Sequence, residues 1–191
     1  MNHLAHCYLS FGDEDLLLGN FIGDYVKGSD WKAYSSGVQT GILLHRAIDA
    51  FTDNSAATSI SKARIRPFAG KFSGPMVDIL YDHLLARSWD RYTDEAFSVF
   101  AAKTYEMLEK RAQEMPLSLQ KRLPNMIAGD FLNGYRHEKG MAFVLERFSQ
   151  RLPLPVDWKG ILGCFWEQMS DFEADFAVFF PDLVEHARQQ I

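Results

Sequence analysis

Polar side chains recur at helical spacing inside apolar segments of this sequence. Residues three or four positions apart lie on the same face of a helix, so each such pair predicts two polar groups directed to one side. Three of the pairs, Asn20 with Asp24, His45 with Asp49 and Asp78 with Asp82, interrupt apolar helical segments, where a solvent-facing position is not expected. The four pairs are His3 with His6, Asn20 with Asp24, His45 with Asp49, and Asp78 with Asp82.

These pairs predict a metal centre. Burying a lone carboxylate costs several kcal/mol, which approaches the whole stability of a domain, unless a cation compensates. Helical metalloproteins build their sites from imidazole and carboxylate groups that converge from several helices. Mixed nitrogen and oxygen ligands suit Mn, Fe or Zn better than Ca.

Each pair also has a structural interpretation that the sequence leaves open. Asn20 could bridge helices through the backbone, and Asp24 could face solvent near the end of its helix. Asp49 could orient His45 without binding the metal itself, as acceptors beside metal-bound imidazoles do. Asp78 and Asp82 could instead form ion pairs with nearby arginines.

The elements that must position these groups are helices. Apolar residues recur every three or four positions and no alternating stretch predicts a sheet, so we expect an all-α, single-domain multi-helix bundle over residues 1–191. The last segment is expected to bend or break at Pro181. The predicted helices cover residues 13–27, 38–51, 75–87, 95–113, 140–148 and 157–188.

Charge and composition limit the partners. The net charge of −5 argues against broad nucleic-acid binding, and the chain contains no membrane-spanning run or secretory signal, so we expect a cytoplasmic protein with Cys7 and Cys164 reduced. Between Asp53 and Asp78 there is no acidic residue, and this basic segment could steer an anionic partner or be an ordinary solvated segment. Its cations are Lys62, Arg64, Arg66 and Lys71.

Four linked motifs in the first ninety residues resemble the acyl carrier protein phosphodiesterase family. They begin with Asn2-x-Leu4-Ala5-His6 and continue with the run from Gly19 to Gly28. The third runs from Gly41 through His45-Arg46-x-Ile48-Asp49 to Asp53, and the fourth runs from Asp78 through Tyr81-Asp82-His83 to Trp89. The remaining hundred residues agree mainly in length and in a closing helix rich in phenylalanine.

The resemblance implies a helical fold distantly similar to the HD-domain metal phosphohydrolases. It also implies Mn²⁺-dependent removal of the 4′-phosphopantetheine arm from holo acyl carrier protein, a small and strongly acidic protein that the basic segment would dock. Two features depart from the pattern. His3 stands where an apolar residue is expected, and Asp82-His83 reverses the order of an HD dyad.

From the pairs and the resemblance together we formulate a hypothesis for the site. His6, Asp24, His45 and Asp82 bind one or two divalent ions, most simply Mn²⁺ with Fe²⁺ or Mg²⁺ as alternatives, and Asp49 is a further ligand or an orienting group. Arg46 stabilises the phosphoryl charge, His83 is a ligand, an orienting group or the general acid, and Asn20 holds water or a phosphate oxygen. Two rival hypotheses are a metal phosphohydrolase acting on nucleotides or another small phosphodiester, and a non-enzymatic helical binding module.

Overall fold

The computed structural model describes all residues, 1–191, and contains helices and no strands. The expected all-α fold class is therefore confirmed. The α-helices are α1 (His3–Tyr8), α2 (Glu14–Ile22), α3 (Ser36–Asn54), α4 (Ala56–Ala69), α5 (Ser73–Arg87), α6 (Phe97–Lys110), α7 (Leu117–Ala128), α8 (Phe131–Gly134), α9 (Glu138–Ser149), α10 (Trp158–Glu167) and α11 (Met169–Arg188). Short 3-10 helices are η1 (Gly23–Tyr25), η2 (Asp30–Ala33), η3 (Gly70–Phe72), η4 (Trp89–Arg91) and η5 (Ala112–Glu114).

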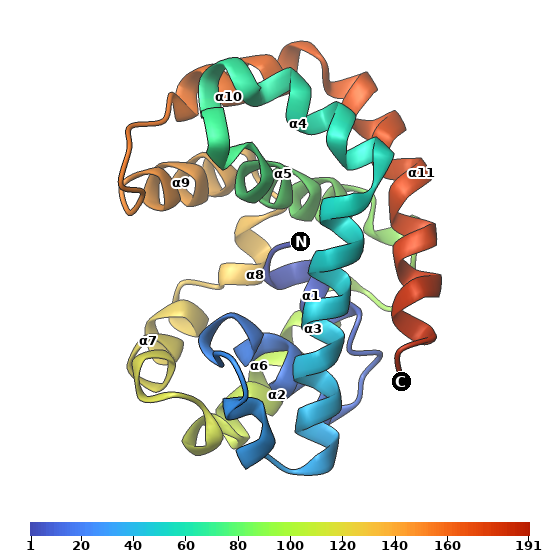
Figure 1. Cartoon of the computed structure of the whole chain (residues 1–191), viewed down its shortest axis with the longest axis vertical. Helices are drawn as coiled ribbons and strands as arrows, with labels where there is room; N and C mark the ends of the chain where they lie inside the picture. The colour runs from blue at the N-terminus through green and yellow to red at the C-terminus, as the bar shows by residue number, and fades with distance from the viewer.

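The helices gather into two parts joined by α3. Figure 1 shows α4, α5, α9 and α10 in the upper part and α2, α6 and α7 in the lower part, with α1 and α8 between them. Helix α3 runs through both, packing against α2 at one end and against α4 and α11 at the other. One continuous hydrophobic core links the two parts. This arrangement leaves an opening between the parts on the side where α7 and α9 face each other.

Three expectations about the helices are wrong. The expected helix over residues 13–27 ends at Ile22 and continues only as the single turn η1, and the basic segment forms α4 where no helix was predicted. The closing segment breaks near Gln168, between α10 and α11, and continues through Pro181. Buried phenylalanines before this proline, Phe176 and Phe180 among them, and buried Leu183 after it hold the helix in place despite the missing N–H. No helix is both long enough and apolar enough to cross a membrane.

Candidate metal centre

Helix α1 carries His6 and is held in place by α5. The helix has only six residues, too few to be stable alone. The buried carboxylate of Asp82 accepts hydrogen bonds from the first backbone N–H groups of α1, at 2.7 Å from Leu4 and 3.3 Å from both Asn2 and Ala5. A negative charge at this end is also favoured by the helix dipole. Asp82 therefore positions His6 through the backbone of α1.

Glycines allow α2 and α3 to approach until their backbones touch. A Cβ atom at Gly19 would overlap the backbone of α3, and one at Gly41 would approach the carbonyl oxygen of Leu16 to 2.6 Å. Just beyond α2, a Cβ at Gly23 would overlap the imidazole ring of His45. These positions tolerate no side chain, and the close crossing brings the carbonyl of Asn20 within hydrogen-bonding distance of His45.

Asn20 sets the orientation of both buried imidazoles. The Nδ1–H group of His45 donates to the backbone carbonyl of Asn20 at 2.8 Å, and the Nδ1–H group of His6 donates to its side-chain oxygen at 2.6 Å. The amide group of Asn20 donates in turn to the carbonyl of His6 at 2.8 Å and to the hydroxyl of Ser10 at 3.3 Å. Because Nδ1 is the donor in each ring, Nε2 is free to offer a lone pair to a metal.

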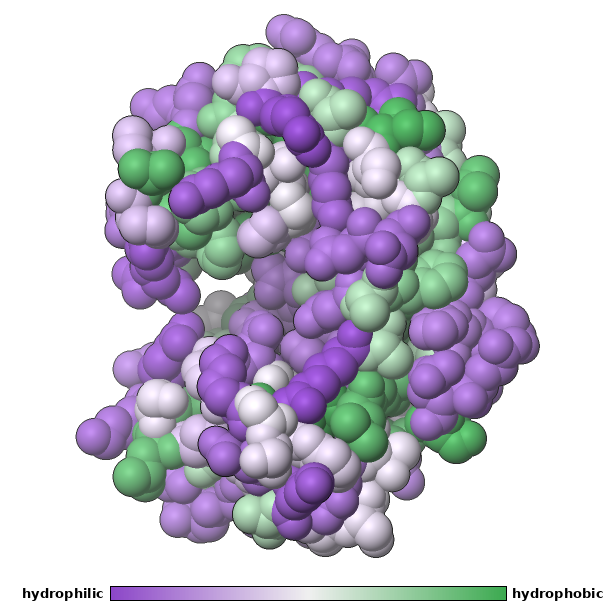
Figure 2. Space-filling model, in the orientation of Figure 1, coloured by the Kyte–Doolittle hydropathy of each residue, from purple (hydrophilic) through white to green (hydrophobic).

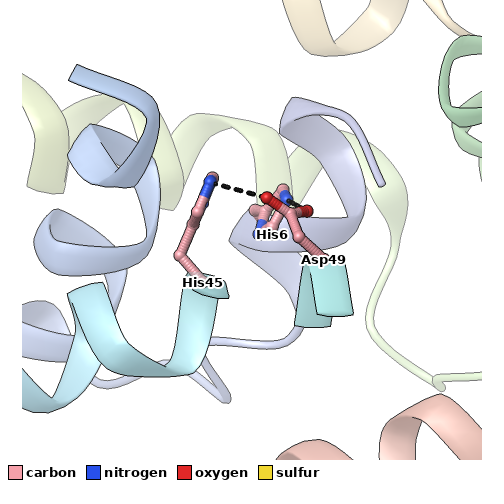
Figure 3. A group of neighbouring side chains, drawn as sticks. All are labelled: His6, His45 and Asp49. Atoms are coloured by element: carbon pink, nitrogen blue, oxygen red, sulfur yellow. Dashed lines mark ion pairs between the residues drawn. The ribbon is translucent and has the colours of Figure 1, made fainter. Parts of the chain in front are cut away.

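The two Nε2 atoms converge on one carboxylate. Asp49 places Oδ1 at 3.2 Å from Nε2 of His6 and Oδ2 at 3.1 Å from Nε2 of His45, and the two rings stack with centroids 4.1 Å apart. Both Nε2 atoms are buried and make no hydrogen bond. Figure 3 shows His45 and Asp49 projecting from α3 towards His6. Ligand atoms from all three residues lie within 4.8 Å of one another, which is the arrangement a metal ion requires.

Asp24 lies beside His6, His45 and Asp49 at the exposed edge of the site. Its Oδ1 lies 3.4 Å from Nε2 of His45, and its side chain is 73% exposed, so it can meet both a metal ion and an incoming ligand. The pKa of its carboxyl group is lowered, first by this close approach to His45. Asp24 is therefore ionised across the neutral pH range.

His6, His45 and Asp49 shift one another's pKa values. Burial lowers the pKa of His45, but the close carboxylates of Asp24 and Asp49 outweigh it and raise the value to about 9. Burial and the neighbouring His45 cation lower the pKa of His6 to about 4. Burial raises the pKa of Asp49, yet its bonds with the two histidines reverse this and hold the pKa below its usual range. The site thus holds an ionised carboxylate on Asp49, a neutral imidazole on His6 and a protonated imidazole on His45. A metal ion that binds here would displace the proton of His45 and take over its positive charge.

A cavity of about 320 Å³ opens in front of this group. Four carboxylates line it, and the amino group of Met1 lies 3.3 Å from Asp78 and 3.5 Å from Asp49. Figure 2 shows the corresponding side of the molecule hollowed between its two parts, with mostly hydrophilic residues around the hollow. The four carboxylates are Asp24, Asp49, Asp53 and Asp78, and the apolar wall includes Pro75 and Phe148.

Three residues of the hypothesis lie outside this group. The oxygens of Asp82 are used by the α1 backbone, so the structure gives it the positioning role described above. His83 donates from Nδ1 to the carbonyl of Tyr135 at 2.7 Å, and its ring lies edge-on to Phe165 and Trp166, away from the cavity lining. Successive residues of a helix point about 100° apart, which is why Asp82 and His83 face different surroundings.

Arg46 is also used for structure. Its guanidinium group donates to the carbonyls of Val26 and Gly28, at 3.2 and 3.1 Å, and so ties the segment after η1 to α3. Gly28 adopts a positive φ of 51° at this point. Arg46 thus supports the element that carries Asp24, and the structure does not show it in the cavity lining.

His3, the departure from the expected pattern, belongs to an aromatic cluster. Its ring lies 5.4 Å from that of Phe21 and 5.8 Å from that of Phe131, and burial lowers its pKa to about 4. It is not part of the group that could hold a metal ion.

Half of the basic segment is neutralised within the protein. Lys62 forms an ion pair with Asp53 at 2.7 Å, and Arg64 forms one with Asp175. Arg66 and Lys71 are exposed and have no carboxylate partner. Docking through this segment stays a prediction.

Several contributors to the site were not predicted from the sequence. Asp53 lines the cavity, the hydroxyl of Ser10 accepts from Asn20, and Gly23 leaves room for the ring of His45. The spacing Gly19-x-x-x-Gly23 was the available signal, because two glycines on one helix face indicate close approach of another element. No sequence signal placed the amino group of Met1 beside Asp78.

Comparison with known proteins identifies the family. The family model described as acyl carrier protein phosphodiesterase matches residues 1–183. The chain belongs to the acyl carrier protein phosphodiesterase family. A curated acyl carrier protein phosphodiesterase from Enterobacter sp. (strain 638) is 36% identical over 195 aligned residues, which cover all of this chain and 99% of that relative. Proteins of the same name from Klebsiella pneumoniae and Pectobacterium atrosepticum are 34% and 27% identical, again over all of this chain and 99% of each relative.

Every residue of the metal group lies within the span matched to the acyl carrier protein phosphodiesterase family. The resemblance stated from the four motifs is therefore confirmed. No solved structure matches the chain, and the HD-like architecture stays a prediction.

Proposed function

We propose that this protein hydrolyses the phosphodiester that joins the 4′-phosphopantetheine arm to a serine of holo acyl carrier protein, with a divalent metal held by His6, His45 and Asp49. The observation that carries the proposal is a pair of buried Nε2 atoms without hydrogen-bond partners, aimed at one carboxylate inside a family of this name. Release of the arm would leave the apo carrier protein with its serine hydroxyl free.

The residues fit a divalent cation. Both imidazoles are oriented by hydrogen bonds from Nδ1, as metal-binding histidines are, and Asp49 presents one oxygen to each ring. Nitrogen and oxygen ligands together suit Mn²⁺ or Fe²⁺, and we favour Mn²⁺, with Fe²⁺ or Mg²⁺ as alternatives. The exposed carboxylate of Asp24 would be the fourth ligand.

The charge of the cavity supports the same inference. Asp24 and Asp49, whose carboxyl pKa values are lowered, line the space that a phosphodiester anion would have to enter, and the amino group of Met1 and the side chain of Lys62 are the cations in contact with the acidic lining. An anionic substrate would be repelled from such a cavity without further positive charge. When bound, a divalent cation supplies that charge and Lewis acidity towards the phosphoryl oxygens.

Residues of the chain would carry out the remaining steps. Water attacks phosphorus as the bond from phosphorus to the seryl oxygen breaks, and that oxygen then needs a proton. His83 lies away from the cavity lining, whereas Asp78 lines it. Burial raises the pKa of Asp78, so its carboxyl group retains a proton more readily than its neighbours do. We assign Asp78 as the proton donor in place of His83.

The direct test is mass spectrometry of holo carrier protein incubated with this protein and Mn²⁺. Loss of the phosphopantetheine mass from the wild-type reaction, and its retention with Asp49→Asn, is the expected result. A panel of nucleotides and small phosphodiesters run in parallel separates the rival substrate class, and turnover of these alone would refute the proposed substrate.

Metal content provides a readout independent of turnover. Elemental analysis of protein purified without chelator and then loaded with Mn²⁺ should give close to one ion per chain for wild type and much less for His45→Ala. Equal metal content in both proteins would remove His45 from the proposed ligand set.

A further inference from the structure

Exposed cations without a carboxylate partner lie on and beside α7 and α9, the helices on either side of the opening between the two parts of the molecule. Between residues 121 and 151 the chain carries six lysines and arginines against three carboxylates, although its net charge is −5. All six side chains are exposed, and none forms an ion pair. We name these residues the cleft-mouth surface: Lys121, Arg122, Arg136, Lys139, Arg147 and Arg151.

The helices that carry this surface adjoin the cavity on both sides. On one side the guanidinium group of Arg122 donates to the hydroxyl of Tyr25 at 3.0 Å, and Tyr25 directly follows Asp24 of the metal group. On the other side Phe148 lines the cavity from α9, and Arg147 directly precedes it. Figure 1 shows α7 and α9 on either side of the opening between the two parts of the molecule.

The contrast with α4 favours this surface over the basic segment. Lys62 and Arg64 of α4 are paired with Asp53 and Asp175, so their charge is largely cancelled at a distance. The cations of the cleft-mouth surface retain their charge for a partner. Two of them, Arg136 and Arg147, lie over aromatic rings, which orient a guanidinium group without neutralising it.

We propose that the cleft-mouth surface docks the acidic face of the carrier protein and so delivers the phosphodiester to the metal cavity. The inference rests on the proposed function for the choice of partner. It deepens that function by giving the two charges of the site separate roles. The carboxylates inside the cavity hold cations, and the exposed cations outside it attract an acidic protein that those carboxylates alone would repel.

The test is charge reversal at the surface, with hydrolysis and binding measured separately. Arg147→Glu/Arg151→Glu should raise the KM for holo carrier protein by about 10-fold or more with little change in kcat, because steering affects encounter more than chemistry. The affinity for apo carrier protein, measured by fluorescence anisotropy, should fall in parallel. Both effects should shrink as salt concentration rises.

The matched control is Arg91→Glu/Arg188→Glu, which reverses two exposed cations beside α11, away from the cavity lining. This variant should keep the wild-type KM. A rise confined to Arg66→Glu/Lys71→Glu in the basic segment of α4 and η3, or an equal rise in all variants, would overturn the proposal.

The two readouts separate this inference from the proposed function. If the wild type hydrolyses holo carrier protein and Arg147→Glu/Arg151→Glu leaves both KM and affinity unchanged, the docking surface is refuted and the activity stands. If the wild type binds carrier protein through this surface without hydrolysing it, docking stands and the proposed activity fails. If the wild type neither binds nor hydrolyses it, both are refuted.

Discussion

Two pairs of an imidazole and a carboxylate lie in apolar helices of this protein and differ in structure. His45 and Asp49 on α3 turn towards a shared space with His6, and the Nε2 atoms of both rings lack a hydrogen-bond partner. Asp82 and His83 on α5 turn away from each other, and the carboxylate of Asp82 is fully used by α1. Nε2 of His83 also lacks a hydrogen-bond partner, but its ring lies edge-on to Phe165 and Trp166 and does not face the cavity. The comparison teaches that a buried polar residue in an apolar helix signals a binding partner. The neighbouring elements decide whether that partner is a metal ion, as proposed for Asp49, or the N-terminus of a helix, as for Asp82.

The largest expected effect comes from a mutation in the pair His45 and Asp49, which we call the open pair. Asp49→Asn removes the charge that both imidazoles face, and activity towards holo carrier protein should fall on the order of 10³-fold. The helical circular dichroism should remain close to that of wild type, because Asp49 contributes to no cap or core contact. Retention of full turnover would exclude Asp49 from the site.

The second effect comes from a mutation in the pair Asp82 and His83, which we call the closed pair, and it should appear mainly in the free energy of unfolding. Asp82→Ala leaves the first N–H groups of α1 buried without an acceptor, and the free energy of unfolding should fall by about 3 kcal/mol. Urea denaturation measures this change, with Asp24→Ala as the exposed-carboxylate control, which should cost far less. A stability loss for Asp24→Ala that matches Asp82→Ala would contradict the division of roles.

The third effect disturbs the open pair without removing a ligand. Gly23→Ala places a methyl group against the ring of His45, and the affinity for Mn²⁺ should fall roughly 10- to 100-fold because ligand orientation is lost. Isothermal titration with Mn²⁺ provides the measurement. Gly134→Ala, where a Cβ meets no neighbouring atom, is the matched control and should bind as wild type does.

The smallest effect is a pH dependence from the closed pair. Burial lowers the pKa of His83 below the 6.5 of an unfolded chain, so the unfolded state takes up a proton first as pH falls. The stability that His83 contributes is therefore complete above pH 6.5 and declines as pH drops towards the folded-state pKa. Unfolding curves at pH 7 and pH 5 should show a smaller decline for His83→Phe than for wild type, and an equal decline would refute the assignment.

The sequence allowed the helical class and most of the metal group to be predicted. His45 and Asp49 stand four residues apart in an apolar helix, and this spacing places them on one face whatever the rest of the fold does. Asn20 was included for a similar reason, although its use of backbone and side chain to orient two imidazoles depends on the crossing of α2 and α3. His6 lies on a helix too short for periodicity to orient it.

The remaining assignments depended on tertiary contacts. Asp82 and Asp49 present the same sequence pattern, and only the arrival of the α1 N-terminus at Asp82 distinguishes them. Arg46 and Arg122 differ in the same way, because the guanidinium group of Arg46 meets backbone carbonyls and that of Arg122 meets the hydroxyl of Tyr25. Pro181 lies inside a helix because buried phenylalanines on α11 outweigh its local preference.

The bare crossing of Gly19 over Gly41 has a consequence for how this protein could diverge. No side chain lies between the two helices at this crossing, so any substitution adds atoms and pushes the backbones apart. Surface arginines on α7 and α9 face no such restriction. Descendants of this chain could therefore acquire new protein substrates while inheriting the same chemistry.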